Sequence, residues 1–323
     1  MFRTIMTGVM ISLAALTSPA AGQSSWPSKQ LRLVVPFPPG GNVDVAARIV
    51  AERLQPLLGQ PAIIENKPGA GGLIAGEFVA KSDPDGHTLF VGANGPVLFA
   101  PIMAGRRAYE WRNDFAPIST LTVTPIILQV KPALPAKDMK ELVDLARSQP
   151  GKLNMAAPGA GSTNHLMSEL MQSLSGLSLT TIQYKGNAPP TNDLVAGHVD
   201  FNFDQISVAL PFVQNGKTRA LAITGAARHK SLPDVPTFSE AGFGNIDGLT
   251  FTALLAPAKT PSAAIERLNG ALRTILAEDT VRAKFEQIGS QALHMTPGEF
   301  RQYLEKEDAR WLPVVKKLVA ASK

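Results

Sequence analysis

Two glycine turns in this sequence have the composition and spacing of an anion-binding site. The first lies in VVPFPPGGNVDVAAR, residues 34–48, where an apolar run meets prolines and paired glycines directly before an amphipathic run. Backbone N–H groups in the first turn of a helix have no partner within the helix and carry partial positive charge, so they favour a bound anion. The candidate ligand-binding residues of this turn are Phe37, Pro38, Gly40, Gly41, Asn42 and Asp44.

The side chains of this first turn suggest more specific roles. Phe37 ends the predicted strand and can cover an apolar part of a ligand. Asp44 has two interpretations, because an acid repels a bound carboxylate. It caps its own helix, or it holds a bridging water or an amino group of the ligand. The turn taken alone also fits an ordinary strand–helix connection.

The second glycine turn lies in APGAGSTNHLMSELM, residues 157–171, and again separates an apolar run from a helical pattern. Hydroxyl and amide groups here stand beside free backbone N–H groups, so the turn offers several donors to an anion. His165 falls in the first helical turn, where a structural hydrogen bond to a neighbouring loop is the simpler explanation. The candidate ligand-binding residues of this turn are Gly159, Ala160, Gly161, Ser162, Thr163, Asn164 and His165.

A short predicted strand adds two further candidates. In FNFDQ, residues 201–205, Phe203 and Asp204 are expected where the strand ends at the cleft. Asp204 has the same two interpretations as Asp44, because it is a second acid near the expected anion.

Other motifs do not support a nucleotide or a metal. Residues 215–218 resemble the end of a P-loop, but Pro211 stands where its first glycine belongs. Residues 69–72 follow a strand as a dinucleotide-binding turn does, but Ile74 replaces the third glycine. The histidines show no metal-ligand spacing. We therefore predict no cofactor and no metal.

The sequence also favours binding over catalysis. No G-x-S-x-G nucleophile motif surrounds Ser162, so no nucleophile is predicted and no catalytic residue is assigned. One alternative remains open, an exported hydrolase or isomerase that uses Asp44, His165 or Asp204 as acid or base.

Apolar runs alternate with amphipathic runs along most of the chain, which predicts an α/β fold with mainly parallel sheets. The predicted strands are 31–37, 61–66, 87–94, 153–158, 179–184, 201–205 and 219–225. The predicted helices are 43–58, 73–81, 137–147, 163–174, 190–196, 208–215, 262–277, 280–288 and 297–319. Two extended segments, 118–130 and 249–257, cross between the two runs of alternation.

These crossings divide the chain into two predicted lobes. Residues 27–122 with 252–323 form the first lobe, because the last helices are expected to return to it, and residues 123–251 form the second. Open parallel sheets bind ligands beyond the carboxyl ends of their strands, so facing lobes would share one cleft. A single continuous doubly wound domain is the alternative.

Composition and the N-terminus indicate an exported protein. The chain has 323 residues, is 45% hydrophobic, and carries a net charge of +5 without a basic block, so we predict no nucleic-acid partner. Residues 1–22 read as a signal peptide, with Arg3 before an apolar run and cleavage after Ala20 or Gly22. A buried N-terminal helix is the alternative. The absence of cysteine excludes disulfides and a lipid anchor on a cysteine, so we expect a soluble, exported protein.

The two turns, together with ENKPGAGG, YKGNAPPTNDLVAGHVDFNFDQ, RALAITGAARHKSLPDVPTFSEAG and LLAPAKTP, resemble the Bug family. These are periplasmic solute receptors of tripartite tricarboxylate transporters, and the resemblance covers essentially the whole mature chain. It implies a two-lobed periplasmic binding protein fold, a Venus-flytrap, that closes on a small carboxylate. It also implies membrane transporter subunits as partners; a ligand-sensing role without transport remains open.

The resemblance also implies which residues hold the carboxylate, often through ordered water. The matching positions are Gly40, Gly41, Asp44, Gly159, Gly161, Ser162, Thr163 and His165. Two departures concern ligand identity more than class. The segment GLTFTALLAP lacks the tryptophan that many relatives carry before this strand, and Ala188–Thr191 varies a commoner alanine-rich pattern.

Overall fold

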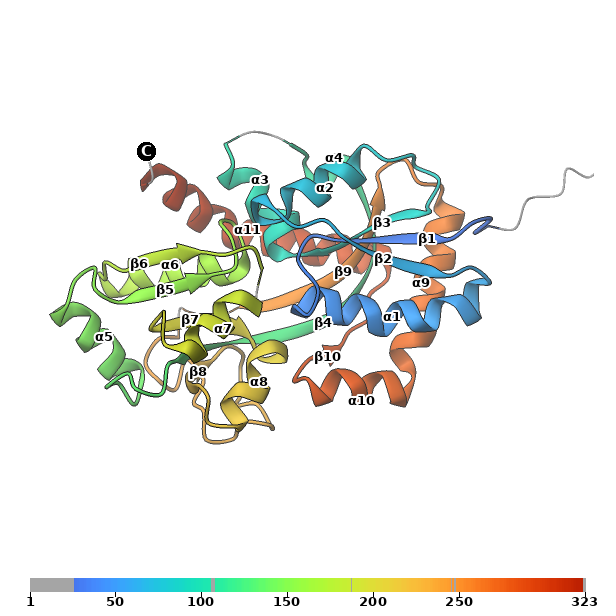
Figure 1. The fold of residues 1–323 in the computed structure, drawn as a ribbon. Helices are drawn as coiled ribbons and strands as arrows, with labels where there is room; N and C mark the ends of the chain where they lie inside the picture. The colour runs from blue at the N-terminus through green and yellow to red at the C-terminus, as the bar shows by residue number, and fades with distance from the viewer. Residues whose placement is uncertain (1–25, 106–107, 187, 245, 247, 322–323) are drawn as a thin grey trace, which may run out of the picture.

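The computed structural model describes residues 26–105, 108–186, 188–244, 246 and 248–321 (Figure 1). The predicted signal peptide, residues 1–22, lies outside the described residues. The strands are β1 (Leu31–Val35), β2 (Ala62–Asn66), β3 (Thr88–Ala93), β4 (Phe115–Val130), β5 (Asn154–Ala157), β6 (Thr180–Gln183), β7 (Phe201–Gln205), β8 (Arg219–Ile223), β9 (Leu249–Pro257) and β10 (Gln291–Ala292). Their order is β2-β1-β3-β9-β4-β7-β5-β6, with β8 and β10 also paired to β4.

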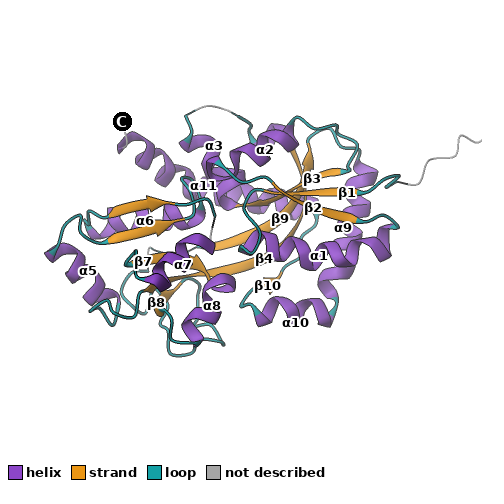
Figure 2. Ribbon diagram, viewed as in Figure 1, coloured by secondary structure: helices purple, strands orange, loops and turns teal. Residues whose placement is uncertain are grey.

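Helices cover this sheet and connect its strands (Figure 2). They are α1 (Asn42–Leu58), α2 (Leu73–Ala80), α3 (Ala100–Met103), α4 (Trp111–Asp114), α5 (Met139–Ser148), α6 (Thr163–Ser175), α7 (Ala188–Ala196), α8 (Ile206–Gln214), α9 (Ser262–Ala277), α10 (Asp279–Gln287) and α11 (Pro297–Ala321). A 3-10 turn, η1 (Ala70–Gly72), and a π-helical segment, η2 (Gly95–Phe99), complete the elements. The predicted α/β class is confirmed.

Two long strands, β4 and β9, join two groups of parallel strands. β1 pairs in parallel with β2 and β3, and β5 pairs in parallel with β6 and β7. The residues 115–125 of β4 pair antiparallel with β9, whereas 126–130 pair antiparallel with β7 and β8. We call β1–β3, β9, residues 115–125 and the helices on them the first unit. The second unit comprises β5–β8 and residues 126–130 with α5–α8.

Figure 1 shows this division directly, because β4 and β9 run across the middle of the molecule between the two groups. Both crossings were predicted from their extended apolar character. The prediction of 249–257 coincides with β9, and the prediction of 118–130 begins three residues after the observed start of β4.

Local sequence explains why the helices behind the two glycine turns form where they do. α1 buries Val43, Ala46, Val50 and Leu54 at helical spacing and packs them against the first unit's sheet. It ends at Gly59, whose φ of 78° is the left-handed conformation that glycine adopts readily, and the Gly59 N–H donates to a carbonyl of the last turn. The predicted starts, residues 43 and 163, lie within one residue of the observed starts of α1 and α6.

The segment between β3 and β4 contains elements that the sequence patterns do not indicate. The chain passes through η2, α3 and α4 within residues 95–114. Pro96 and Pro101 interrupt any regular period in this segment, and α3 and α4 are single turns. These elements matter because η2 contacts the second unit, as described below.

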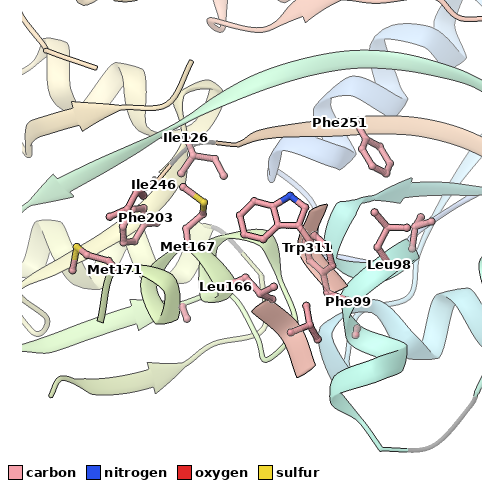
Figure 3. Packing of buried hydrophobic residues seen from close by; sticks show 14 of the residues in the cluster. Leu98, Phe99, Ile126, Leu166, Met167, Met171, Phe203, Ile246, Phe251 and Trp311 are labelled. Carbon is pink, nitrogen blue, oxygen red and sulfur yellow. The ribbon is translucent and has the colours of Figure 1, made fainter. Parts of the chain in front are cut away.

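The C-terminal helices pack against the first unit, and the last of them also reaches the second. α9 and α10 pack against α1. α11 contacts β4, α3 and η2 and also α6 in the second unit. Its Trp311 ring lies 5.7 Å from the ring of Phe99, and Figure 3 shows Trp311 between Phe99 and the pair Leu166 and Met167. The hydrophobic core is therefore continuous across the two units.

Candidate ligand-binding site between two helix N-termini

The first turns of α1 and α6 meet at one small pocket between the units. Its walls come from both turns, from the ends of β3 and β7, from the start of β9 and from the start of η2. The lining residues are Phe37, Asn42, Val43, Ala93, Pro96, Ser162, Thr163, Asn164, Gln205 and Thr250. The inner pocket has a volume of about 10 Å³, measured as the space open to the centre of a water-sized sphere, which is roughly the room that one water needs.

The start of α6 presents several donors to the inner pocket. Ser162 is the N-cap residue, and its Oγ accepts the His165 N–H at 3.2 Å. The proton of the Ser162 hydroxyl is then available to donate. Among the described residues, no acceptor bonds to the backbone N–H groups of Thr163 or Asn164. Because the N-terminal end of a helix carries partial positive charge, this turn suits an anion.

Two amide side chains, Asn164 and Gln205, lie at the rear of the inner pocket, and hydrogen bonds fix their orientation. Asn164 Nδ2 donates to the Phe203 carbonyl at 2.7 Å. Gln205 Nε2 donates to Asn164 Oδ1 at 2.7 Å and to Thr250 Oγ1 at 3.0 Å. These hydrogen bonds connect α6 and the end of β7 with the start of β9. The rear of the pocket is therefore held by regular secondary structure of both units.

Asn42 ties the start of α1 to the surrounding strands and to the second unit. Its Oδ1 accepts from Ser207 Oγ at 2.7 Å and from Thr124 Oγ1 at 3.2 Å. Its Nδ2 donates to Thr252 Oγ1 at 3.3 Å. The side chain of Asn42 is therefore occupied, and its contribution to a ligand comes from the backbone N–H groups of its helical turn.

Asp44 lies buried beneath the first glycine turn and does not line the inner pocket. Its carboxylate accepts from the Gly40 N–H at 3.0 Å, from Arg48 at 2.9 and 3.0 Å and from Asn66 at 2.9 Å. Burial alone raises the pKa of Asp44, but these hydrogen bonds outweigh it and bring the pKa below its ordinary value. The structure thus places Asp44 as a support of the turn.

Substituting Asp44 is expected to lower the free energy of unfolding by an amount that depends on pH. The Asp44→Asn variant is expected to lose about 1–3 kcal/mol of unfolding free energy at pH 7, because a charged acceptor of three donors is removed. The pKa of Asp44 is lower in the folded chain than in the unfolded chain. Its contribution is therefore fully present above the ordinary value of 3.8 and is lost as the pH falls from there through the folded-state pKa.

Urea unfolding at a series of pH values measures this difference. The exposed Asp234 provides a control, and its Asp234→Asn variant should stay within about 0.5 kcal/mol of the wild type at every pH. A deficit in Asp44→Asn that stays constant down to the lowest pH would contradict the assignment.

His165 supports the second turn from within. Its Nδ1 accepts from the Gly161 N–H at 3.4 Å, and its Nε2 lies 3.7 Å from a carboxylate oxygen of Glu169. Burial lowers the pKa of His165, so the neutral ring, which can accept at Nδ1, is favoured. The hydrogen bond from Gly161 is consistent with the structural role that the sequence suggested for His165, a hydrogen bond to a neighbouring loop.

Phe203 and Asp204 lie behind the site and do not line it. Phe203 is buried in the core, where its ring stacks on that of Phe238 with centroids 5.9 Å apart. Asp204 Oδ2 accepts from Thr191 Oγ1 at 2.5 Å, and Asp204 Oδ1 accepts from the Gln205 N–H at 2.9 Å. The structure thus places both as supports of the end of β7.

A second, outer cavity lies next to the inner pocket and shares Phe37 with it. The volume of this cavity is about 290 Å³, measured as the space open to the centre of a water-sized sphere. The lining residues come from loops of both units: Phe37, Pro68, Gly69, Ala70, Gly71, Gly72, Leu73, Ala100, Met103, Ala104, Pro158, Gly159, Ala160, Tyr184, Lys185 and Gly186. Three of the candidates, Phe37, Gly159 and Ala160, therefore line the outer cavity.

The remaining candidates shape the rims of the two turns. Pro38 packs on Gly186 of the second unit, where an added Cβ would lie 2.6 Å from Pro38 Cδ. Gly40 is exposed with a φ of 87°, and Gly41 is the N-cap residue of α1.

Glycines allow the two units to touch backbone to backbone beside the inner pocket. A Cβ on Gly95 would lie 2.7 Å from the Gly161 carbonyl oxygen and 2.9 Å from Ser162 Cα. A Cβ on Gly161 would lie 2.8 Å from Ala100 Cα, and one on Gly71 would overlap the Ala160 carbonyl. We call these contacts the glycine seam. Side chains at these positions would hold the units apart.

Several residues on the two pockets were not singled out from the sequence. Gln205 lies within FNFDQ, and Lys185 lies within the YKG motif, but neither pattern shows that the residue faces a ligand. Thr250 belongs to an extended crossing that reads only as apolar. The PGAGG turn, residues 68–72, resembles a dinucleotide-binding turn and also matches the Bug family, but neither pattern indicates that it forms one wall of the outer cavity.

The described residues hold no candidate metal centre and no membrane span. No three His, Cys, Asp or Glu side chains among them gather where a metal ion could be held. None of the described helices combines the length and apolar character needed to cross a bilayer.

Two α/β units joined by β4 and β9, with a polar pocket between their helix N-termini, define a two-lobed solute-binding protein of the periplasmic binding protein fold. The model of the tripartite tricarboxylate transporter family receptor matches residues 46–319. The chain belongs to this receptor family.

Known relatives agree with this assignment. BugT from Bordetella pertussis is 32% identical over 98% of this chain and 97% of its own. MatC from Rhodopseudomonas palustris, solved with bound malate, is 35% identical with a TM-score of 0.87, over 90% of this chain and 100% of its own. Rpa4515 from R. palustris, solved with adipate, is 34% identical with a TM-score of 0.86, over 90% and 97%. The family and its solved members are solute receptors rather than enzymes, which answers the open alternative of a hydrolase or isomerase.

Proposed function

We propose that this protein is a monomeric, soluble periplasmic receptor that binds a small carboxylate in the inner pocket and delivers it to the membrane subunits of a tripartite transporter. The observation that carries the proposal is the meeting of two helix N-termini, α1 and α6, at one small pocket between the units. Malate and adipate in solved relatives support the ligand class. The family description and the periplasmic relatives support the location and the partner.

The mechanism follows from the same contacts. In an open form, a carboxylate docks on the first turn of one helix. Closure then brings the second turn onto it, with the Ser162 and Thr163 hydroxyls and the free backbone N–H groups as donors. The ligand stabilises the closed form only through contacts it makes there and not in the open form. Charge-assisted hydrogen bonds contribute about 1.5–3 kcal/mol each, so a few of them suffice for micromolar affinity, about −8 kcal/mol.

We also propose the lobe boundaries and the supporting roles of the candidate residues. Residues 27–122 with 252–323 form one lobe and 123–251 the other. The change of partner of β4 between Pro125 and Ile126 supports a hinge close to these positions. Phe37, Asn42, Ser162, Thr163 and Asn164 surround the bound group, and the other candidates hold the turns in place.

A thermal-shift screen tests the ligand class. The mature protein is heated with a panel of carboxylates and their neutral amides. A ligand that binds the folded state raises the midpoint. A rise with an acid that is absent with its amide supports the proposal, and equal shifts with acid and amide would contradict it.

Removing the two hydroxyls of α6 should weaken binding. The double variant Ser162→Ala/Thr163→Ala is expected to bind its carboxylate at least about tenfold more weakly, because two donors to a charged group are lost. Isothermal titration calorimetry measures the affinity. The matched control is Ser148→Ala/Thr180→Ala, which removes two exposed hydroxyls from the same unit. Equal affinity in a folded Ser162→Ala/Thr163→Ala protein would exclude this turn as the site.

A further inference from the structure

One side-chain hydrogen bond joins the two units next to the inner pocket without belonging to its wall. Ser207, the second residue of α8, donates from Oγ to Asn42 Oδ1 at 2.7 Å. Asn42 is the first residue of α1, is 3% exposed and lines the inner pocket, whereas Ser207 does not line it. A ligand at the helix N-termini would therefore contact the turn that Ser207 holds but not Ser207 itself.

The other hydrogen bonds of the Asn42 side chain stay within the first unit. Thr124 Oγ1 donates to Asn42 Oδ1 at 3.2 Å, and Asn42 Nδ2 donates to Thr252 Oγ1 at 3.3 Å. Because the proton of Thr124 is directed at Asn42, the hydroxyl of Ser290 donates to Thr124 Oγ1, 2.9 Å away. Among the described residues, Ser207 is the one partner of the Asn42 side chain that comes from the second unit.

The residue before Ser207 also packs against the first unit. A Cβ on Gly289, two residues after the end of α10, would lie 2.8 Å from Ile206 Cγ2. The start of α8 therefore rests on the first unit at two consecutive residues, on the side chain of Asn42 and on the backbone of Gly289. These contacts are separate from the glycine seam, in which the second glycine turn touches η1, η2 and α3.

We propose, on the basis of the function proposed above, that Ser207 is a positioning residue of the closed receptor, whose hydrogen bond to Asn42 forms when the units close and slows the release of the ligand. Opening must break this bond before the ligand can leave, whereas docking on the open form does not need it. Asn42 keeps its partners Thr124 and Thr252 in the open form, so the first turn of α1 stays oriented for the next ligand. The dissociation rate then depends on Ser207, and the association rate does not.

Both rates are measured on ligand-free protein with a carboxylate probe. The chain has no cysteine, so it can be unfolded in guanidinium, dialysed and refolded without disulfide exchange. Malate, adipate, citrate and benzoate are titrated, and the tightest of them is the probe. Stopped-flow tryptophan fluorescence gives the rates, because the ring of Trp311 lies against Phe99 of the first unit and close to Met167 of the second.

Removing the hydroxyl of Ser207 should change one rate only. Ser207→Ala is expected to raise the dissociation rate roughly 2- to 13-fold, the effect of one net hydrogen bond, and to leave the association rate and the ligand-free thermal midpoint unchanged. Ser207→Thr keeps the hydroxyl and should retain slow dissociation. The matched control is Ser262→Ala, which removes an exposed hydroxyl from the first turn of α9 and should change neither rate.

A double-mutant cycle shows whether the effect passes through Asn42. Asn42→Ala removes the acceptor of the Ser207 hydroxyl and is itself expected to weaken binding, because the first turn of α1 loses its bonds to Thr124 and Thr252. In that background, Ser207→Ala should raise the dissociation rate no further. An effect of the same size in both backgrounds would mean that the hydroxyl acts elsewhere, and the inference would be wrong.

The outcomes separate this inference from the proposed function. If Ser207→Ala releases the probe as slowly as the wild type, the inference is wrong and the carboxylate receptor stands. A fall in the ligand-free midpoint of Ser207→Ala would also overturn it, because the bond would then be present in the open form. If no carboxylate of the panel binds the refolded wild type, while its circular dichroism matches the native protein, both proposals fail.

Discussion

Replacing Gly95 with alanine is expected to weaken ligand binding roughly 5- to 150-fold while the ligand-free protein remains folded. The new Cβ would lie 2.7 Å from the Gly161 carbonyl oxygen and 3.3 Å from the Thr163 backbone nitrogen, both in the opposite unit. Overpacking of this kind costs about 1–3 kcal/mol, which corresponds to the stated range of affinities.

The effect on binding follows from where the strain falls. The neighbours of the added methyl group are backbone atoms of the second unit, which cannot rotate away as a flexible side chain can. In an open form the second unit moves away, so the methyl group loses its three nearest neighbours, Gly161 O, Ser162 Cα and Thr163 N. The strain is therefore confined to the closed, ligand-bound form, and closure becomes less favourable by the same amount.

Gly95 is a better test of the glycine seam than Gly71. Gly71 has a φ of 64°, so a side chain there would be strained in the open form as well. Gly95 has no such positive φ. Gly270, inside α9, is the matched control, because an added Cβ has no heavy atom within 4 Å. Gly270→Ala should leave affinity unchanged and add up to about 1 kcal/mol of stability.

Calorimetric affinity and the thermal midpoint without ligand are the two measurements. If Gly95→Ala binds as tightly as the wild type, the units do not need to approach this closely to hold the ligand. A large fall in the ligand-free midpoint would mean that the seam is part of the resting fold rather than of closure alone.

Truncating Trp311 to alanine should produce the largest loss of stability. The Trp311 side chain is 2% exposed and lies against Phe99 in the first unit. It also lies close to Met167 of α6, in the second unit. A single Cβ added to Gly248 would be 3.0 Å from Trp311 Cζ2 and 3.7 Å from Met167 Sδ. Removing so large a buried ring costs about 3–5 kcal/mol.

Urea unfolding followed by circular dichroism measures this loss, and Trp311→Phe is its matched control. Within the described residues, the indole N–H of Trp311 has no hydrogen-bond partner, so phenylalanine forfeits packing but no hydrogen bond. A loss of about 1–2 kcal/mol is expected for Trp311→Phe. Equal losses in both variants would contradict the prediction, because phenylalanine keeps most of the buried ring that alanine removes.

These two predictions concern contacts between the units, and they share a physical cause. α11 packs against elements of both units, while the glycine seam lets η2 approach the start of α6. The first contact is buried hydrocarbon, which stabilises the fold. The second is backbone against backbone at the edge of the pocket, which determines how far the cleft can close.

The sequence by itself determined the local architecture. Strand, glycine turn and helix follow one another in both units because hydrophobic period, capping residues and glycine act over a few neighbours. Ser162 as an N-cap and Gly59 as a helix stop are of this kind. The extended crossings were predictable for the same reason, and so was part of the surroundings of Asp44, since Arg48 lies one helical turn away.

Only the tertiary structure decided which of these local features meet. Nothing in the sequence shows that Asn66 completes the hydrogen bonds of Asp44, or that Ser207 reaches Asn42 across the hinge. Both contacts join positions far apart in the chain, and they depend on strand order and on the packing of helices. Lys185 and Gly95 are ordinary residues in the sequence, and they gain their significance from the loops of the opposite unit that fold against them.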